Sequence, residues 1–381
     1  MGGSRRWRER VSPSRYNTGD PDLDRRIEEL LDAVGATEDR DQLFEILVSG
    51  EALAGDHADR LDLKITNAAL KEMRNAFNIF APYRDVPKVT IFGSARTRRD
   101  DPLYVQAVDL ARGLADRGWM VVTGAGPGIM EAGMEGAGRA RAIGVQIRLP
   151  FEERANEIIA GDPKLAEMKY FFTRKLMLVK ESAAFVALPG GFGTLDETFE
   201  LLTLVQTGKA LPVPIVLLDT PDGTFWTGFE TFLREQVARL GLISPGDDCL
   251  YEVTDSVETA LAEIDTFYRN YHSLRYVGDR LVIRLRAAPT KDELADLTRR
   301  YAHVLIDGRI ESTRPFPPEV SGDDHLELPR IQLHFDRRSM GDLRRLIDDL
   351  NALPSAPTGT AKPPTVGEES DVDRRRDRAE S

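Results

Sequence analysis

From residue 88 onward, short apolar runs alternate with amphipathic segments. Continuous apolar runs bounded by glycine or proline are typical of strands that are buried on both faces of a parallel sheet. The segments between these runs carry apolar residues at helical spacing. The predicted strands are 89–92, 119–123, 143–149, 183–188 and 213–218, and the predicted helices are 102–117, 128–141, 163–182, 196–208 and 226–240. The pattern predicts an α/β domain over 85–272 with a doubly wound parallel sheet of the Rossmann-like type.

The chain in front of this domain has a different pattern. Residues 1–20 are polar and unpatterned, and we expect them to form a disordered tail. Asp20 followed by Pro21 is a typical helix start. The region 21–84 is therefore predicted to be helical, and its predicted helices are 21–34, 38–49 and 57–81.

After the α/β domain the pattern changes again. Residues 278–352 are predicted to form a small α+β unit, in which no catalytic motif is evident. The predicted strands are 280–286 and 326–335, and the predicted helices are 291–303 and 340–350. The segment 354–381 is proline-rich and then charged, which predicts a second disordered tail.

Composition narrows the classes of function. The 381-residue chain has a formal net charge of −12, which disfavours a general binder of nucleic acid polymers or of anionic membranes. It has one cysteine, Cys249, and five scattered histidines, so we expect no disulfide and no metal site. No apolar run reaches the roughly 20 residues that span a bilayer, and the N-terminus lacks the apolar stretch of a signal peptide. We therefore expect a cytoplasmic protein.

Three predicted strands end in glycine-containing loops, at the sheet edge where doubly wound proteins bind ligands. Glycine lets the backbone approach a ligand closely, and the start of the following helix favours an anion. The first loop contains Gly93-Ser94 and the second runs Gly124-Ala-Gly-Pro-Gly-Ile-Met-Glu131. These loops make the following residues candidate ligand contacts: Ser94, Gly126, Gly128 and Glu131.

The third loop, Pro189-Gly-Gly-Phe-Gly-Thr-Leu-Asp-Glu197, allows two interpretations. Thr194 and Glu197 have the spacing of a capping box, in which both side chains only stabilise a helix start. Alternatively, the loop holds a phosphate beside a carboxylate. The second interpretation gains weight because two glycine loops lie on strands of one sheet.

Other nucleotide-binding motifs fit poorly. The loop at Gly124 differs from GxGxxG, and the next strand ends without the acidic residue that would hold a ribose, which disfavours a dinucleotide. The sequence contains no GxxxxGK[ST]. Upstream of the third loop, Arg174 and Lys175 lie on a predicted helix with an apolar stripe, and each is either a solvated surface cation or a cation directed into a site.

Three sequence features together resemble the LOG family, whose members are often labelled lysine decarboxylases. They are Gly124-Ala-Gly-Pro-Gly-Ile-Met-Glu131, the pair Arg174-Lys175, and the complete PGGxGTxxE motif that ends at Glu197. The resemblance covers about residues 86–270. One departure lies beside the pair: small family members read Met-His-x-Arg-Lys, whereas this chain has Phe171 and Phe172 in the first two positions.

The resemblance implies a phosphoribohydrolase that cleaves a nucleoside 5′-monophosphate, of the AMP or cytokinin ribotide type, into free base and ribose 5-phosphate. It assigns catalysis to Glu197 with help from Arg174, and it needs no cofactor. It also implies a homodimer or a higher homo-oligomer. It assigns phosphate or substrate binding to Gly190, Gly191, Gly193, Thr194 and Lys175.

Two alternatives stay open at this stage. One is a nucleotide-binding regulatory protein with little turnover, in which the C-terminal unit is the regulator. The other is an amino-acid decarboxylase, which requires a lysine-bound pyridoxal group for which the sequence gives no support.

Overall fold

The computed structural model describes residues 16–148 and 155–364. The chain forms two compact units, of which the first ends at Lys71 and the second begins at Glu72. The boundaries predicted for the separate regions stay a prediction. Most of both predicted disordered tails, and the end of the strand predicted over 143–149, lie outside the described residues.

The first unit is helical. It contains α1 (Pro21–Ala33), α2 (Arg40–Gly55) and the beginning of α3 (Arg60–Phe80). The carboxylate of Asp20 accepts hydrogen bonds from the backbone of Asp22 and Leu23, as the predicted helix start requires. A small core holds α1 against α2 through Ile27, Leu31, Phe44 and Val48.

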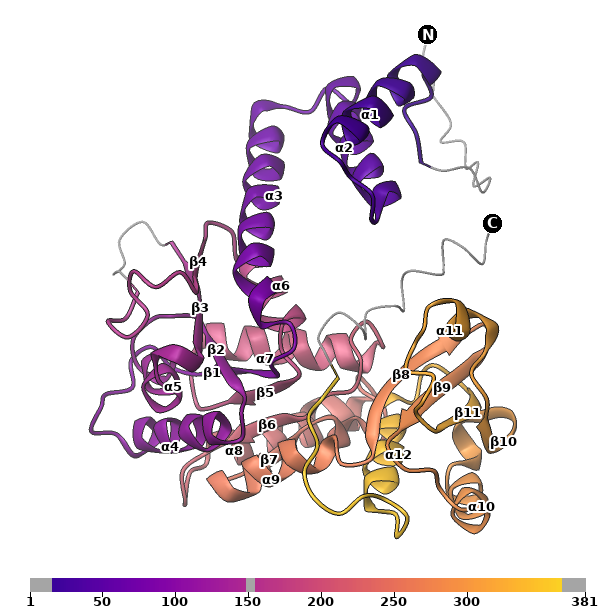
Figure 1. Ribbon diagram of the computed structural model, residues 1–381. Coiled ribbons are helices and arrows are strands. Elements are labelled where there is room, and N and C mark those ends of the chain that lie inside the picture. The colour runs from indigo at the N-terminus through magenta and orange to yellow at the C-terminus, as the bar shows by residue number, and fades with distance from the viewer. Residues whose placement is uncertain (1–15, 149–154, 365–381) are drawn as a thin grey trace. The chain divides into compact units, whose positions relative to one another are not determined.

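The second unit contains a seven-stranded parallel sheet with the strand order β4-β3-β2-β1-β5-β6-β7 (Figure 1). The strands are β1 (Lys88–Phe92), β2 (Met120–Thr123), β3 (Ala142–Ile147), β4 (Leu165–Met168), β5 (Ala184–Ala187), β6 (Ile215–Leu218) and β7 (Glu252–Thr254). The strand order reverses at β1, whose neighbours are β2 and β5. This confirms the predicted doubly wound fold and places the switch point, where such folds bind ligands, at β1.

Helices cover both faces of this sheet. They are α4 (Pro102–Asp116), α5 (Ile129–Ala137), α6 (Phe171–Lys180), α7 (Phe192–Gln206), α8 (Phe225–Phe232) and α9 (Val257–Phe267). Alternate strand residues enter two separate cores. Val121 and Val186, for example, pack with α4, α5 and α9, whereas Val122 and Phe185 pack with α6, α7, α8 and the end of α3.

The helix predicted over 163–182 is wrong in its first part, which forms the edge strand β4 before α6 begins at Phe171. Ala166 and Met168 are buried while Glu167 between them is exposed, which is the alternation of a strand. The apolar residues of this strand happen to continue the helical spacing of α6, which made the two elements look like one helix. The edge strand β7 was also missed, because three residues give no measurable period.

A second, antiparallel sheet has the strand order β10-β11-β9-β8 (Figure 1). Its strands are β8 (Tyr271–Val277), β9 (Arg280–Leu285), β10 (Leu305–Thr313) and β11 (Arg330–Phe335), accompanied by α10 (Lys291–Arg300), α11 (Pro317–Ser321) and α12 (Met340–Ala352). The predicted α+β unit is thus present, although β8 and β10 were not predicted. Its apolar face joins the same core as α4 and α9.

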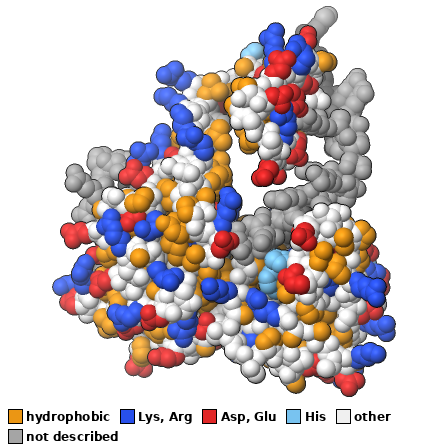
Figure 2. Space-filling model, in the orientation of Figure 1, with side chains coloured by type: hydrophobic (Ala, Val, Ile, Leu, Met, Phe, Trp, Pro, Cys, Tyr) orange, Lys and Arg blue, Asp and Glu red, His pale blue; other side chains and the backbone are white. Residues whose placement is uncertain are grey.

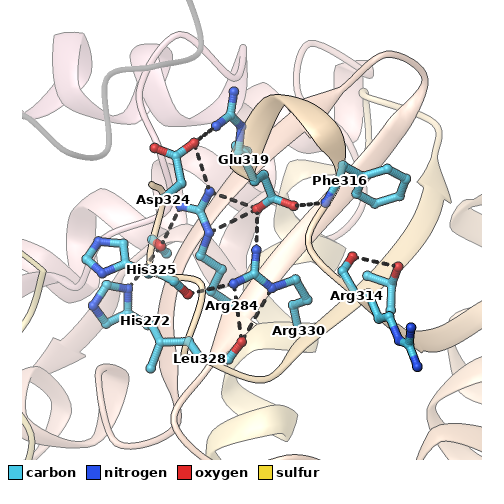
Figure 3. Close-up of polar contacts among 12 residues, drawn as sticks. His272, Arg284, Arg314, Phe316, Glu319, Asp324, His325, Leu328 and Arg330 are labelled. Atoms are coloured by element: carbon cyan, nitrogen blue, oxygen red, sulfur yellow. Dashed lines mark hydrogen bonds and ion pairs between the residues drawn. The ribbon is translucent and has the colours of Figure 1, made fainter. Parts of the chain in front are cut away.

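The other face of the antiparallel sheet carries a buried polar cluster (Figure 3). Glu319, which is fully buried, accepts hydrogen bonds from Arg284 at 2.9 Å and from Arg330 at 2.8 Å. Asp324 pairs with Arg275 and lies 3.6 Å from Arg284. These contacts tie α11 to β9 and β11, and the turn after α11 to β8 and β9.

Candidate functional site

The three glycine loops lie side by side because β2, β1 and β5 are neighbours in the sheet. The backbone of Ser94, after β1, joins the other two loops. Its N–H donates to the carbonyl of Pro189 at 3.3 Å, and its carbonyl accepts from the N–H of Ile129 at 3.0 Å. The three loops therefore lie together at one edge of the sheet, as the sequence predicted.

Glycine is required at two of these close approaches. Gly128 has φ of +67°, and a Cβ there would lie 2.3 Å from the carbonyl oxygen of Ser94. A Cβ on Gly190 would lie 2.2 Å from the hydroxyl of Thr194 and 3.0 Å from the backbone nitrogen of Ser94. Larger residues at either position would push the loops apart.

Gly191 and Gly193 are in a different situation. A Cβ on either glycine would meet no atom within 4 Å, so both face open space. Gly191 is the N-cap of α7, and the first N–H groups of a helix have no partner within the helix. The start of α7 is therefore both accessible and electrostatically suited to an anion.

The capping-box interpretation of Thr194 and Glu197 is wrong. Helix α7 begins at Phe192, and its N-cap, Gly191, has no side chain to cap it. Thr194 is the third residue of the helix and is buried, so Glu197 lies a further turn along and cannot reach the N-cap as the third residue would. Glu197 needs another explanation.

Glu197 faces the neighbouring helix α6, where it meets Arg174. Arg174 Nη2 lies 3.8 Å from Glu197 Oε1, and both side chains are largely buried, with 12% and 14% of their surface exposed. Arg174 Nε donates to the carbonyl of Val145 at 3.1 Å, which fixes the guanidinium between β3 and α7. Arg174 is thus directed into the site and is not a solvated surface cation.

Burial dominates the electrostatics of this pair. It raises the pKa of the Glu197 carboxyl, and the charges of Arg174 and Lys175 only partly oppose that rise. Burial also lowers the pKa of the Arg174 guanidinium, against the influence of Glu197. A guanidinium stays charged at neutral pH, so the pair is a cation beside a carboxylate that takes up a proton more readily than an ordinary glutamate.

Lys175 is held differently from Arg174. Its ammonium lies 2.8 Å from Asp196 and 2.7 Å from Glu200, both on α7. The hydrogen bonds to these carboxylates raise its pKa, although burial opposes them. Lys175 therefore adds a second ionic contact between α6 and α7, next to the Arg174–Glu197 pair.

The second loop contributes Gly126, Gly128 and Glu131. Glu131 forms an ion pair with Arg99, which belongs to the loop after β1. Gly126 leaves room for Met130, whose Cε would lie 2.6 Å from a Cβ at position 126. The loop also holds Ala125 at a φ of +59°, a value that is uncommon for a residue with a side chain.

Sequence reasoning missed Asn156, which supports this second loop. Its amide group donates to the carbonyls of Ala125 and Gly126, both at 3.1 Å, and its backbone N–H donates to Ala125 at 2.9 Å. Asn156 belongs to no motif, and its distance of 30 residues from the loop left no local signal. Among the described residues, no three His, Cys, Asp or Glu side chains form a group that could hold a metal ion.

The fold and site define a doubly wound α/β protein with a buried carboxylate–guanidinium pair beside an anion-compatible helix start. The family model described as "Possible lysine decarboxylase" matches residues 127–264. The chain belongs to this family, the LOG family, as its similarity to curated relatives shows.

Two of these relatives and one solved structure illustrate the similarity. The rice (Oryza sativa subsp. japonica) protein "Probable cytokinin riboside 5'-monophosphate phosphoribohydrolase LOGL3" is 35% identical over 40% of this chain and 69% of its own length. The cytokinin riboside 5'-monophosphate phosphoribohydrolase of Mycobacterium tuberculosis (strain ATCC 25618 / H37Rv) is 31% identical over 41% of this chain and 81% of its own length. The molybdenum cofactor carrier protein of Chlamydomonas reinhardtii is 22% identical, with a TM-score of 0.33, over 46% of this chain and 94% of its own.

Proposed function

We propose that this protein hydrolyses the N-glycosidic bond of a nucleoside 5′-monophosphate, of the AMP or cytokinin ribotide type, to free base and ribose 5-phosphate. The observation that carries the proposal is the buried pair of Arg174 and Glu197 beside the open start of α7. The names of the family relatives point to the same reaction.

In this proposal the start of α7 binds the 5′-phosphate. The N–H groups around Gly191 and Gly193 and the dipole of a 15-residue helix supply the attraction for the anion. Thr194 and Gly190 hold the shape of the loop through their contact with each other. Anchoring a group that does not react provides binding energy that orients the ribose.

Glu197 then acts on the ribose. It lies four residues after Gly193 and six after Gly191, which is about 6–9 Å along the axis of α7, so a phosphate and a ribose carbon fall within reach of one helix start. Cleavage of a glycosidic bond passes through a sugar with oxocarbenium character. The carboxylate stabilises that positive charge and orients the attacking water. The C–N bonding electron pair leaves with the base, the water oxygen bonds to the anomeric carbon, and the proton that this water loses ends on the base.

Arg174 favours the ionised form of Glu197, which the proposed reaction needs. Its positive charge favours the ionised carboxylate against the effect of burial. The hydrogen bond from Arg174 to the carbonyl of Val145 holds the guanidinium in one orientation. A catalytic group that is already oriented contributes more to the rate than a mobile one. Lys175, through Asp196 and Glu200, fixes the spacing of the two helices.

We also propose that the protein is a homodimer or a higher homo-oligomer. Figure 2 shows hydrophobic side chains of all sizes (orange) on the visible face of the molecule. Large hydrophobic side chains are exposed on the helices that carry the site. They include Phe171, Phe172 and Leu176 of α6 and Phe192 and Phe199 of α7. A second copy packed on these helices would cover them. No helix in the described ranges combines the length and hydrophobicity of a bilayer-spanning segment.

The proposed activity is tested by incubating the purified protein with AMP, GMP, CMP and isopentenyladenine ribotide and separating the products by chromatography. We expect free base and ribose 5-phosphate in equal amounts from at least one of these substrates. Adenosine, which lacks the phosphate, serves as the control and should be a much poorer substrate. Tight nucleotide binding without release of base would instead favour a regulatory protein.

A further inference from the structure

Glu72 of α3 makes contacts that the proposed mechanism does not use. It is the first residue of the second unit, and only 8% of its surface is exposed. Its carboxylate accepts hydrogen bonds from the backbone N–H of Lys169 at 3.0 Å and of Tyr170 at 3.5 Å. It also lies 2.7 Å from the hydroxyl of Thr173. One carboxylate therefore holds the turn that leads from β4 into α6.

The start of α6 lacks a cap of its own. Tyr170 is its N-cap and provides no side-chain hydrogen bond. The hydroxyl of Thr173 has a single proton, for which the carbonyl of Tyr170 at 2.9 Å competes with the closer, charged Glu72. A negative charge at this end of the helix also complements the helix dipole. Glu72 thus replaces the missing cap from about 100 residues away in sequence.

The reactive part of the site begins directly after this turn. Arg174 is the residue after Thr173, and its guanidinium lies 3.8 Å from Glu197. The backbone N–H of Arg174 donates to the carbonyl of Tyr170. The N–H of Tyr170 in turn donates to the carboxylate of Glu72. A shift of the first turn of α6 therefore moves Arg174 relative to α7.

We propose that Glu72 is a positioning residue, which clamps the turn from β4 into α6 and so sets where Arg174 lies against Glu197. The end of α3 is on this account part of the scaffold of the site. The expected effect of Glu72 on kcat rests on the proposed hydrolysis, whereas its expected effect on the position of Arg174 does not.

The test compares Glu72→Gln with Glu293→Gln. Glutamine has the shape of glutamate but replaces one acceptor oxygen with a donor, so it cannot serve the three donors that face Glu72. Glu293 is a matched control, because its carboxylate caps the start of α10 in the antiparallel-sheet region. Both variants should fold, and both should lose some thermal stability.

In crystal structures of the two variants, we expect the Arg174–Glu197 separation to change in Glu72→Gln and to stay near 3.8 Å in Glu293→Gln. With a nucleotide that the wild-type protein cleaves, Glu72→Gln should have a kcat lower than that of the wild type by about tenfold or more. Its KM should stay within about twofold of the wild-type value, because the substitution leaves the phosphate site unchanged. Combined with Arg174→Ala, the same substitution should lower kcat no further, because Glu72 acts through Arg174.

The opposite results overturn the proposal. An unmoved Arg174 in Glu72→Gln would show that Glu72 only stabilises the fold, and so would an unchanged kcat in an active protein. Equal kcat losses from Glu72→Gln with and without Arg174 would show that Glu72 acts by another route. If the wild type cleaves none of the nucleotides, the proposed function fails, and the position of Arg174 in the variant structure alone decides the role of Glu72.

Discussion

The backbone of Gly124 lies directly against the guanidinium of Arg174. A Cβ at position 124 would be 2.1 Å from Arg174 Nη2 and 2.7 Å from the sulfur of Met130. The second glycine loop thus provides the space that the site cation occupies. This relationship explains why glycine is needed at position 124, which was not among the predicted ligand contacts.

Gly124→Ala should therefore impair activity more than stability. Both colliding atoms belong to the outer ends of long side chains, so Arg174 and Met130 move aside while the fold persists. We expect kcat to fall by about 100-fold, as a misplacement near 1 Å commonly costs, and Tm to change little. Gly228→Ala, where a Cβ would meet nothing within 4 Å, is the control. Full activity of Gly124→Ala would mean that Arg174 has no role in the reaction.

Gly193→Ala separates substrate binding from catalysis. Gly193 lies in the first turn of α7 and faces open space, so alanine should fit and stabilise the helix by about 0.5–1 kcal/mol. If the 5′-phosphate occupies that space, KM should rise by about tenfold or more while kcat changes little. Steady-state kinetics and thermal melts measure both effects. An unchanged KM would place the phosphate elsewhere.

The pH dependence of kcat/KM should reflect Glu197. The proposed mechanism requires Glu197 as a carboxylate, so activity should rise with pH as Glu197 ionises. Because burial raises the pKa of Glu197, this rise in activity should lie above the ordinary pKa of a glutamate. Arg174→Gln removes a charge that lowers the pKa of Glu197, so the limb should move to higher pH. Asp196→Asn removes a charge that raises the pKa and should move the limb to lower pH. Shifts in the reverse directions would exclude Glu197 as the titrating group.

Glu319→Gln tests the buried cluster of the antiparallel sheet (Figure 3). Glu319 is the carboxylate that both Arg284 and Arg330 contact, and all three side chains are buried. Removing its charge should lower the free energy of unfolding by about 3–5 kcal/mol. The same substitution at exposed Glu235, which pairs with Arg234, should change it by less than about 1 kcal/mol. Urea denaturation compares the two, and equal effects would contradict a stabilising role for the cluster.

The sequence predicted the central sheet well because each of its inner strands is a continuous apolar run. It failed at the edges, where β4 and β7 are short and β4 continues the spacing of α6. In the antiparallel sheet, β8 and β10 were missed. β10 has only one buried residue, Ile310, so it offers little apolar alternation.

The candidate site was predictable where it follows strand ends, and unpredictable where distant residues support it. Ser94, Gly128 and Gly190 meet because neighbouring strands bring their loops together. Asn156 and Glu72 could not be found in this way. Their contacts join segments about 30 and 100 residues apart, and such contacts arise only from the tertiary fold.

The most direct test of the central claim is the rate at which Glu197→Gln releases free base from a saturating nucleoside 5′-monophosphate. Glutamine preserves the size of the side chain but cannot stabilise a developing positive charge on the ribose as a carboxylate does. We predict that this variant folds with a wild-type Tm, binds the nucleotide, and loses at least about 1,000-fold in kcat. A variant that keeps wild-type turnover would contradict the assignment of Glu197 as the catalytic residue.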